Sequence, residues 1–296
     1  MKLFFTFLFF GMHLASTAQI PFFQAHRGGR GLFPENTLIA FEKSLDLGIQ
    51  VMEMDVCISA DGQVVVSHEP YMNPLFSSLP DGSPLSKEDP KQWNLFQMPY
   101  SEIQKFDVGK RGNALFPAQQ KISQSKPLLS QVLTLVEAFR KRTGKSIYYN
   151  IEIKSDEKEY GISQPQTVEE FSQKVADIIQ AQVDPRYIIL QSFDFNVLKF
   201  WHQAIAEKRF PPVLLSALVS RKSPENTIKE LGFSPDIFSS SFSSVNAQVV
   251  QFCHEKHIKV VPWTANELND LQKLMDLKVD GIITDYPDRA LTLSQP

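Results

Sequence analysis

Cysteine is scarce in this sequence. Only Cys57 and Cys253 occur in 296 residues, and they lie far apart without the close spacing of metal-binding cysteines. Cys57 falls in an expected strand and Cys253 in an expected helix. We therefore expect two buried free thiols rather than a disulfide bridge or a cysteine-based metal site.

An excess of charge of either sign is also absent. The chain has 30 lysine and arginine residues against 33 aspartate and glutamate residues, which gives a formal net charge of −3. No basic excess points to nucleic acid, and no long charge run points to an interaction tail. Hydrophobic residues make up 43% of the chain, which is enough for a sizeable core.

Long apolar runs are missing beyond the N-terminus. The chain begins with Lys2, an apolar stretch from Leu3 to Leu14 and small residues up to Ala18. This pattern is typical of a cleaved signal peptide over residues 1–18, and it predicts export to the periplasm or the exterior. An uncleaved anchor is the alternative, although a membrane-spanning helix needs about 20 apolar residues.

Strand-like and helix-like segments alternate along the rest of the chain. About eight apolar runs, each followed by a helix-like segment, predict an α/β fold, a TIM (β/α)₈ barrel over residues 19–296. A doubly wound sheet is the alternative, but the G-x-G-x-x-G fingerprint is absent. Expected strands are 21–25, 49–56, 63–66, 146–153, 187–191, 212–216, 237–239, 258–262 and 281–284. Expected helices are 38–47, 128–141, 168–181, 195–207, 225–231, 247–256 and 268–275.

One stretch interrupts this alternation. Residues 69–126 contain many proline, serine, glutamine and asparagine residues and little periodicity. Long segments without regular structure are uncommon inside compact domains and are often functional. We interpret residues 71–126 as an insertion or lid after the second strand, with a short helix at 100–106.

Three carboxylates are expected on the inner face of the sheet. Glu53 and Asp55 are two residues apart in one strand and share a face, and Glu152 lies on the next strand. Three negative charges in a partly buried place are unfavourable unless a cation balances them. Oxygen ligands suit one divalent ion, Ca²⁺ or Mg²⁺. A solvated face or a plain ion pair with Lys154 is the structural alternative.

Two cations and two histidines accompany these carboxylates. Arg27 and Lys154 beside a metal fit an anionic ligand such as phosphate, because arginine offers it a planar fork of donors. His26 and His68 follow the first strand and the hairpin, and they could supply a general acid and a general base. The pattern leaves open which histidine does which.

Eight short motifs span nearly all of the mature chain. They are A-H-R-G-G at 25–29, P-E-N-T at 34–37, E-M-D-V at 53–56, D-G-Q-V-V-V-S-H at 61–68, I-E-I-K at 151–154, Q-S-F at 191–193, P-W-T at 262–264 and D-G-I-I-T-D-Y-P at 280–287. In this set and order, the sequence resembles the glycerophosphodiester phosphodiesterase family. Glu69 departs from the aspartate that often follows the second histidine in that family, and the insertion looks longer than usual.

The resemblance implies a TIM-barrel enzyme that hydrolyses glycerophosphodiesters to glycerol 3-phosphate and an alcohol. The nucleophile would be the glycerol 2-hydroxyl, which gives a cyclic intermediate, or water. The expected partner is a small molecule, with no nucleic acid and no obligate protein. The implied roles are metal ligation by Glu53, Asp55 and Glu152, acid–base catalysis by His26 and His68, and phosphate binding by Arg27 and Lys154.

Further residues have weaker expectations. Trp263 and Gln191 are added as substrate-binding candidates, although a core position for Trp263 and a strand-end cap for Gln191 fit equally. Glu35 and Asn36 are expected to support the glycine-rich loop. Asp285 is expected to cap the turn that follows it.

Two alternative functions stay open. A lipid-cleaving enzyme, a lysophospholipase D or a phospholipase C-like enzyme, would use the same site. Apolar residues of the insertion such as Phe76, Trp93 and Phe96 would then make transient contact with lipid. A non-catalytic secreted binding protein is the second alternative, but no metal carboxylate or histidine of the set is missing.

Overall fold

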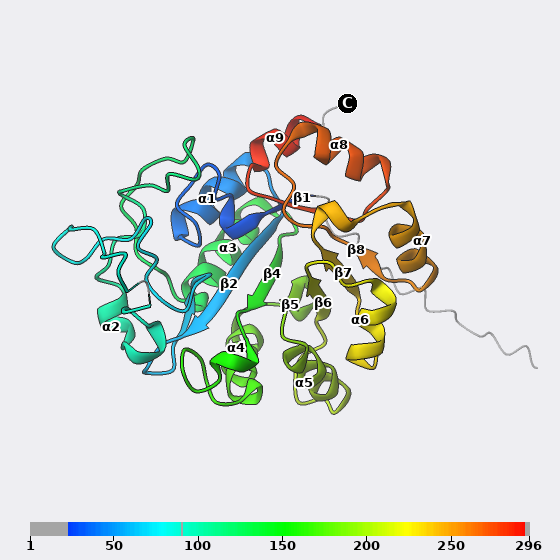
Figure 1. The fold of residues 1–296 in the computed structure, drawn as a ribbon, viewed down its shortest axis with the longest axis horizontal. Helices are drawn as coiled ribbons and strands as arrows, with labels where there is room; N and C mark the ends of the chain where they lie inside the picture. Colours follow the sequence, from blue (N-terminus) through cyan, green and yellow to red (C-terminus); the bar gives the residue numbers. More distant parts are fainter. Residues whose placement is uncertain (1–22, 90, 294–296) are drawn as a thin grey trace, which may run out of the picture.

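The computed structural model describes residues 23–89 and 91–293. Within this part of the chain, eight parallel strands follow the order β8-β7-β6-β5-β4-β2-β1-β9, and β3 pairs antiparallel with β2. Helices surround the sheet (Figure 1). The strands are β1 (Phe23–Ala25), β2 (Val51–Ile58), β3 (Val64–Val66), β4 (Tyr148–Ile153), β5 (Ile188–Ser192), β6 (Leu214–Val219), β7 (Ile237–Ser240), β8 (Lys259–Val260) and β9 (Ile282–Thr284).

Backbone hydrogen bonds close the sheet into a ring. The amide of Asp280 donates to the carbonyl of Val260 at 2.9 Å, and the amide of Ile283 donates to Pro262 at 2.9 Å. The amide of Ala265 donates to the carbonyl of Ile283 at 3.1 Å. These bonds join the end of β8 to β9, so the TIM barrel predicted from the alternation is confirmed.

The helices begin and end close to the predicted positions. The Thr37 side chain accepts from the amide of Ala40 at the start of α1, and Gly48 ends this helix with a φ of 101°. The short C-terminal helix α9 was not predicted. The structure describes no helix long and apolar enough to span a membrane. The larger helices are α1 (Leu38–Leu47), α3 (Leu129–Thr143), α4 (Val168–Gln182), α5 (Phe195–Ala206), α6 (Pro224–Leu231), α7 (Ala247–Glu255), α8 (Leu268–Asp276) and α9 (Pro287–Thr292).

The two faces of β2 have different surroundings, as its alternation predicts. The outward side chains of Met52, Met54 and Val56 belong to the main apolar core between the sheet and the helices. Val51 belongs to a small apolar cluster of strand-start residues inside the barrel, together with Tyr148 and Ile189. Further along the same inner face the residues become acidic, which places the charged groups toward the carboxyl ends of the strands.

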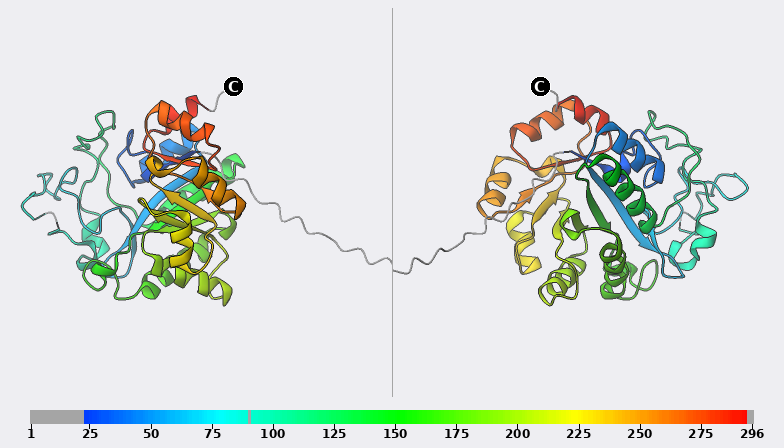
Figure 2. Two further views of the ribbon diagram at one scale, coloured as in Figure 1. Left: turned by 45° about the vertical axis from the view of Figure 1, so that its right-hand side comes forward. Right: turned by 180° about the vertical axis from the view of Figure 1, so that it is seen from behind.

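The insertion, residues 71–126, packs beside the β2–β3 hairpin on one side of the barrel (Figure 2). It contains the short helix α2 (Tyr100–Ile103). Phe76 is only 3% exposed, and Trp93 packs edge-on against Phe106 with ring centroids 5.2 Å apart. Phe96 packs against the main core. The expectation of an exposed lipid-contacting ring is wrong for Phe76, which is buried, whereas Trp93 and Phe96 are partly buried and their contact with lipid stays a prediction.

Two further expectations concern the termini and the thiols. The predicted signal peptide, residues 1–18, lies outside the described residues. Cys57 in β2 and Cys253 in α7 are both buried and free, as predicted.

Candidate active site

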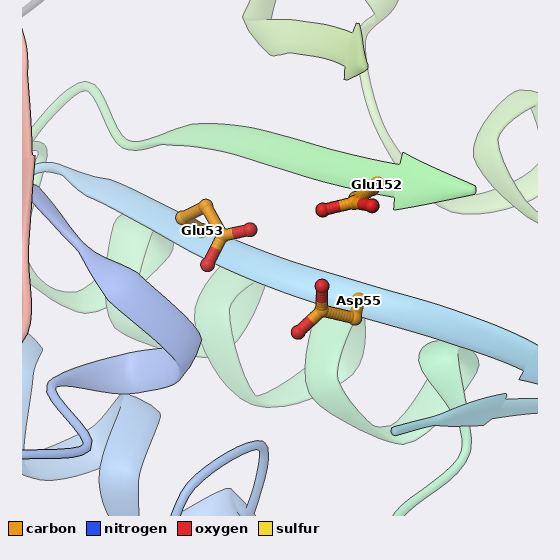
Figure 3. A group of neighbouring side chains, drawn as sticks. All are labelled: Glu53, Asp55 and Glu152. Carbon is orange, nitrogen blue, oxygen red and sulfur yellow. The ribbon is translucent and has the colours of Figure 1, made fainter. Parts of the chain in front are cut away.

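Glu53, Asp55 and Glu152 converge inside the barrel, near the carboxyl ends of β2 and β4 (Figure 3). The sheet register places Asp55 directly opposite Glu152. One carboxylate oxygen from each residue lies within 4.8 Å of the others, and all three side chains are buried. Asp55 Oδ1 is buried without a hydrogen-bond donor. A bare buried carboxylate oxygen is unfavourable, so this donor set fits an oxygen-ligated divalent ion.

The charges of the three carboxylates are strongly coupled. Burial and the neighbouring charges of Asp55 and Glu152 raise the pKa of Glu53 well above its ordinary value. Burial also raises the pKa of Glu152. Burial alone would raise the pKa of Asp55 too, but the positive charges of His68, Arg27 and Lys154 hold it far below its usual range. Mutual repulsion and burial thus disfavour the charged forms of Glu53 and Glu152, and a bound cation would offset both effects.

Arg27 reaches the carboxylates because the loop after β1 turns sharply. Its backbone amide donates to Glu53 Oε2 at 2.7 Å, and its guanidinium donates to Glu35 at 2.8 Å. The guanidinium also lies 3.5 Å from Asp55. Gly28 follows with a φ of 76°, and a Cβ there would lie 2.8 Å from the side chain of Ala40. Only glycine combines this conformation with this close approach.

The P-E-N-T segment supports this loop, as expected. The Glu35 carboxylate accepts a hydrogen bond from the Arg27 guanidinium, and the Asn36 side-chain nitrogen donates to Asp55 Oδ2 at 2.8 Å. The backbone amide of Asn36 donates to the carbonyl of Arg27. Glu35 thus orients the Arg27 guanidinium, and Asn36 orients the carboxylate of Asp55.

Lys154 supplies a second fixed positive charge. Its ammonium donates to Glu152 at 2.8 Å and lies 4.0 Å from Asp55 Oδ1. Burial alone would lower the pKa of Lys154, but Glu152 and Asp55 raise it above its ordinary value. Lys154 therefore stays charged beside the carboxylates, at an edge of the site where an anionic ligand would meet it.

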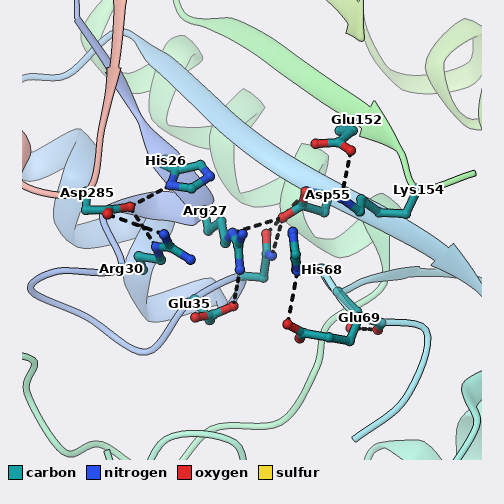
Figure 4. A network of polar contacts seen from close by, with 12 residues as sticks. His26, Arg27, Arg30, Glu35, Asp55, His68, Glu69, Glu152, Lys154 and Asp285 are labelled. Carbon is teal, nitrogen blue, oxygen red and sulfur yellow. Dashed lines mark hydrogen bonds and ion pairs between the residues drawn. The ribbon is translucent and has the colours of Figure 1, made fainter. Parts of the chain in front are cut away.

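Each histidine is held by a carboxylate at the same ring nitrogen (Figure 4). His26 Nδ1 lies 2.5 Å from Asp285 Oδ1, and His68 Nδ1 lies 3.0 Å from Glu69 Oε1. Both rings line one cavity. A carboxylate at Nδ1 holds the proton on that nitrogen and leaves Nε2 available for proton transfer. Burial lowers the pKa of His26 to about 4, against the opposing effect of Asp285.

The sequence-based interpretation of Asp285 is wrong. Asp285 does not cap the following turn; its carboxylate binds His26 and accepts from Arg30 Nε at 2.7 Å and from Asn266 at 2.8 Å. The pairing of β9 with β1 brings these residues together, because Thr284 is the register partner of Ala25. The available signal was the closed barrel itself, in which the last strand must lie beside the first.

The cavity between these groups has a volume of about 110 Å³. A larger groove of about 550 Å³ lies between α1 and α3 on the outside of the barrel, and none of the residues described above lines it. The small cavity is therefore the only one of the two that carries chemistry. Its wall includes both histidines, Arg27, Lys154, Glu53 and Glu152.

The two remaining candidates also reach the cavity wall. The Trp263 indole donates to the carbonyl of Ser239 at 3.1 Å and packs edge-on against Phe193, with ring centroids 5.4 Å apart. Gln191 is 1% exposed; it donates to Glu53 at 3.0 Å and accepts from Asn150 at 3.2 Å. Gln191 thus orients one carboxylate of the cluster, and its contact with substrate stays a prediction.

Comparison with known proteins identifies the family of this chain. Residues 26–289 match the Glycerophosphoryl diester phosphodiesterase family. The chain belongs to this family. It is therefore a phosphodiesterase of the glycerophosphodiester type, as the sequence motifs implied.

Named relatives span almost the whole chain. A glycerophosphodiester phosphodiesterase of Bacillus altitudinis is 28% identical over 92% of this chain and 97% of that protein. A lysophospholipase D of Homo sapiens is 24% identical over 90% of this chain and 83% of that protein. The family therefore includes relatives named for soluble and for lipid substrates.

Solved structures match the fold over a similar extent. A Silicibacter pomeroyi protein that bears the family name superposes with a TM-score of 0.80 at 26% identity, covering 92% of each chain. An Oleispira antarctica phosphodiesterase, solved with its product sn-glycerol-3-phosphate, superposes with a TM-score of 0.72 at 20% identity, covering 93% of this chain and 98% of that chain.

Proposed function

We propose that this phosphodiesterase hydrolyses glycerophosphodiesters to glycerol 3-phosphate and an alcohol, with one divalent metal ion and two histidines. The observation that carries this proposal is a cluster of three buried carboxylates, two of which line one small cavity together with two cations and two carboxylate-held histidines. No other cluster of His, Cys, Asp and Glu side chains in the described part of the chain has metal-binding geometry.

In this proposal Glu53, Asp55 and Glu152 hold the metal ion, either Ca²⁺ or Mg²⁺. When bound, such an ion offsets the charge that develops on the phosphate in the transition state. The buried Asp55 Oδ1, which accepts no hydrogen bond, and the raised pKa of Glu53 support this role, because an ion would satisfy the oxygen and offset the repulsion among the carboxylates.

Arg27 and Lys154 bind the phosphate oxygens from either side of the metal ligands. Arg27 is held by Glu35, so its planar guanidinium is oriented before substrate arrives. Lys154 remains charged beside Glu152. Together they select an anionic group and oppose its repulsion from the carboxylates.

His26 and His68 move the protons through their Nε2 atoms. The histidine that acts as base takes the proton of the attacking hydroxyl as its oxygen bonds to phosphorus. The other histidine, protonated at Nε2, gives its proton to the oxygen of the leaving alcohol as the bond between that oxygen and phosphorus breaks. Two nucleophiles are compatible with this scheme. The substrate's own glycerol 2-hydroxyl can attack to form a cyclic phosphodiester, which water then opens. Alternatively, water attacks the phosphorus directly.

The test is release of glycerol 3-phosphate from glycerophosphocholine by the mature protein. We expect activity to disappear in EDTA and to return with Ca²⁺ or Mg²⁺. Asp55→Asn should abolish both activity and metal binding, measured by calorimetry, whereas Glu207→Gln on the exposed face of the barrel should change neither. Full turnover by a metal-free protein would contradict the metal role.

A lipid substrate is the second candidate, and it rests on two exposed leucines. Leu75 is 45% exposed and Leu115 is 71% exposed, both on the insertion. They are more exposed than Phe76, which is buried. Lysophosphatidylcholine should then be hydrolysed faster than glycerophosphocholine, and Leu75→Ser with Leu115→Ser should reduce only the lipid activity. Equal loss on both substrates would exclude a specific lipid contact.

Export through residues 1–18 is part of the proposal. The N-terminal sequence supports it by its charge, its apolar run and its small residues. Fractionation of cells that express the full chain tests it: the expected product lacks the first 18 residues and lies outside the cytoplasm.

A further inference from the structure

Lys126, at the C-terminal end of the insertion, has a charged side chain that the proposed chemistry does not use. The residue is only 4% exposed, and its ammonium donates to Ser67 Oγ at 2.7 Å. Among residues 23–89 and 91–293, no carboxylate lies within ion-pair distance of it. Lysine is seldom buried without a paired charge, so a buried ammonium held by one serine requires an explanation.

The serine that holds Lys126 lies directly before the second histidine. Ser67 Oγ donates to the backbone carbonyl of Glu69 at 2.6 Å, and the Glu69 carboxylate holds His68 Nδ1 at 3.0 Å. Hydrogen bonds therefore link Lys126 to Ser67 and Ser67 to the backbone of Glu69, and the side chain of Glu69 contacts His68. The chain of contacts starts in the insertion and ends at a ring in the cavity.

The position of Lys126 is itself well fixed. The amide of Val66 donates to the carbonyl of Pro127 at 2.8 Å, and the Tyr100 hydroxyl donates to the carbonyl of Lys126 at 3.2 Å. One contact ties the end of the insertion to β3, and the other ties it to α2. The ammonium is thus placed by the backbone and not by a flexible loop.

Charge adds to the hydrogen bonds. Burial alone would raise the pKa of Glu69, but the bond to His68 and the charges of His68, Lys126 and Arg27 lower it to about 2. Burial lowers the pKa of Lys126, while Glu69 and Glu35 oppose that change. Lys126 and Glu69 therefore favour each other's charged forms although they do not touch.

We propose that Lys126 is a positioning residue, which fixes the Ser67–Glu69 loop and keeps Glu69 against His68 Nδ1. The insertion thereby orients one of the two histidines. This inference rests on the proposed role of His68 in proton transfer. It does not extend to His26, whose carboxylate comes from the end of β9.

The experiment compares Lys126→Met, Lys126→Arg and Ser67→Ala with the wild-type enzyme on glycerophosphocholine. Lys126→Met should lower kcat about tenfold or more, with KM and the calcium affinity within about twofold, because the phosphate and metal ligands are untouched. Lys126→Arg should restore part of the loss. The exposed Lys121 lies in the same segment, and Lys121→Met is the matched control.

Non-additivity gives the sharper readout. Ser67→Ala should reproduce the loss of Lys126→Met, and the double variant should be no slower than Lys126→Met alone, since both changes break one chain of contacts. Additive losses would show two independent effects and would overturn the inference. If Lys126→Met does not fold, Lys126→Gln and Ser67→Ala give the same comparison, with folding checked by thermal unfolding.

The reference variant His68→Ala separates this inference from the proposed function. If His68→Ala keeps wild-type turnover, the role of His68 fails and the inference fails with it. If His68→Ala is inactive while Lys126→Met keeps a normal kcat, only the inference fails. A loss of turnover that appears entirely in KM would also overturn it.

Discussion

Two histidines line the active site, and different parts of the molecule supply the carboxylate that holds each of them. On one side, Asp285 holds His26, and both residues follow paired strands of the barrel, β9 and β1. On the other side, Glu69 holds His68 in a loop after β3, which is an addition to the barrel. The His26 side chain is 12% exposed, and the His68 side chain is 29% exposed.

The difference shows how a barrel acquires a group that its strands do not place. A strand end is fixed by the hydrogen bonds of the sheet, so the pairing of β9 with β1 brings Asp285 to His26, and Arg30 and Asn266 also hold its carboxylate. A loop has no such ladder, and here Lys126 and the insertion supply extra contacts beneath it. The position of His68 should therefore depend more on substitutions in the insertion than on substitutions in the barrel strands.

Removal of either imidazole should have the largest effect. We expect His26→Ala and His68→Ala each to lower kcat about 1,000-fold with little change in metal affinity, because a general acid or base contributes about 10² to 10⁴ in rate. Steady-state kinetics and calcium titration measure the two quantities. Near-normal turnover in one variant would show that only the other histidine transfers protons, so the two histidines would not have equivalent roles.

Removal of the supporting carboxylates should distinguish the two sides. Asp285→Asn should lower kcat about 100-fold, because the charge that holds His26 also holds Arg30 and Asn266. Glu69→Gln should lower kcat only about tenfold, because the Ser67 and Lys126 contacts still hold the loop. The reverse order of effects would show that the loop, and not the strand ends, is the more delicate support.

The barrel half of this comparison could be predicted from the sequence more fully than the loop half. Two-residue periodicity places Glu53 and Asp55 on one face, and the parallel sheet brings Glu152 beside them. Asp285 was missed because its partner is 259 residues away, and only ring closure joins them.

The loop half depends on contacts that have no period. Nothing in the pattern around Lys126 distinguishes a buried ammonium from a surface lysine, and the burial of Phe76 follows from packing beneath an irregular segment. Both depend on how the insertion folds onto the face of the β2–β3 hairpin that carries Cys57 and Val65. Periodicity describes strands and helices, so it carries no information on such a segment.

The last prediction is the pH dependence of stability, and it concerns the His26 side of the site. The pKa of His26 is about 4 in the folded protein against an ordinary value of about 6.5. Between these values the unfolded chain binds a proton that the folded chain does not, so stability falls as the pH falls from 6.5 towards 4. Chemical denaturation in EDTA at pH 7.5 and pH 5 should show about 2 kcal/mol of this loss. His26→Ala should lose less stability over that pH range than the wild type; equal losses in the two proteins would mean that burial of His26 does not shift its titration.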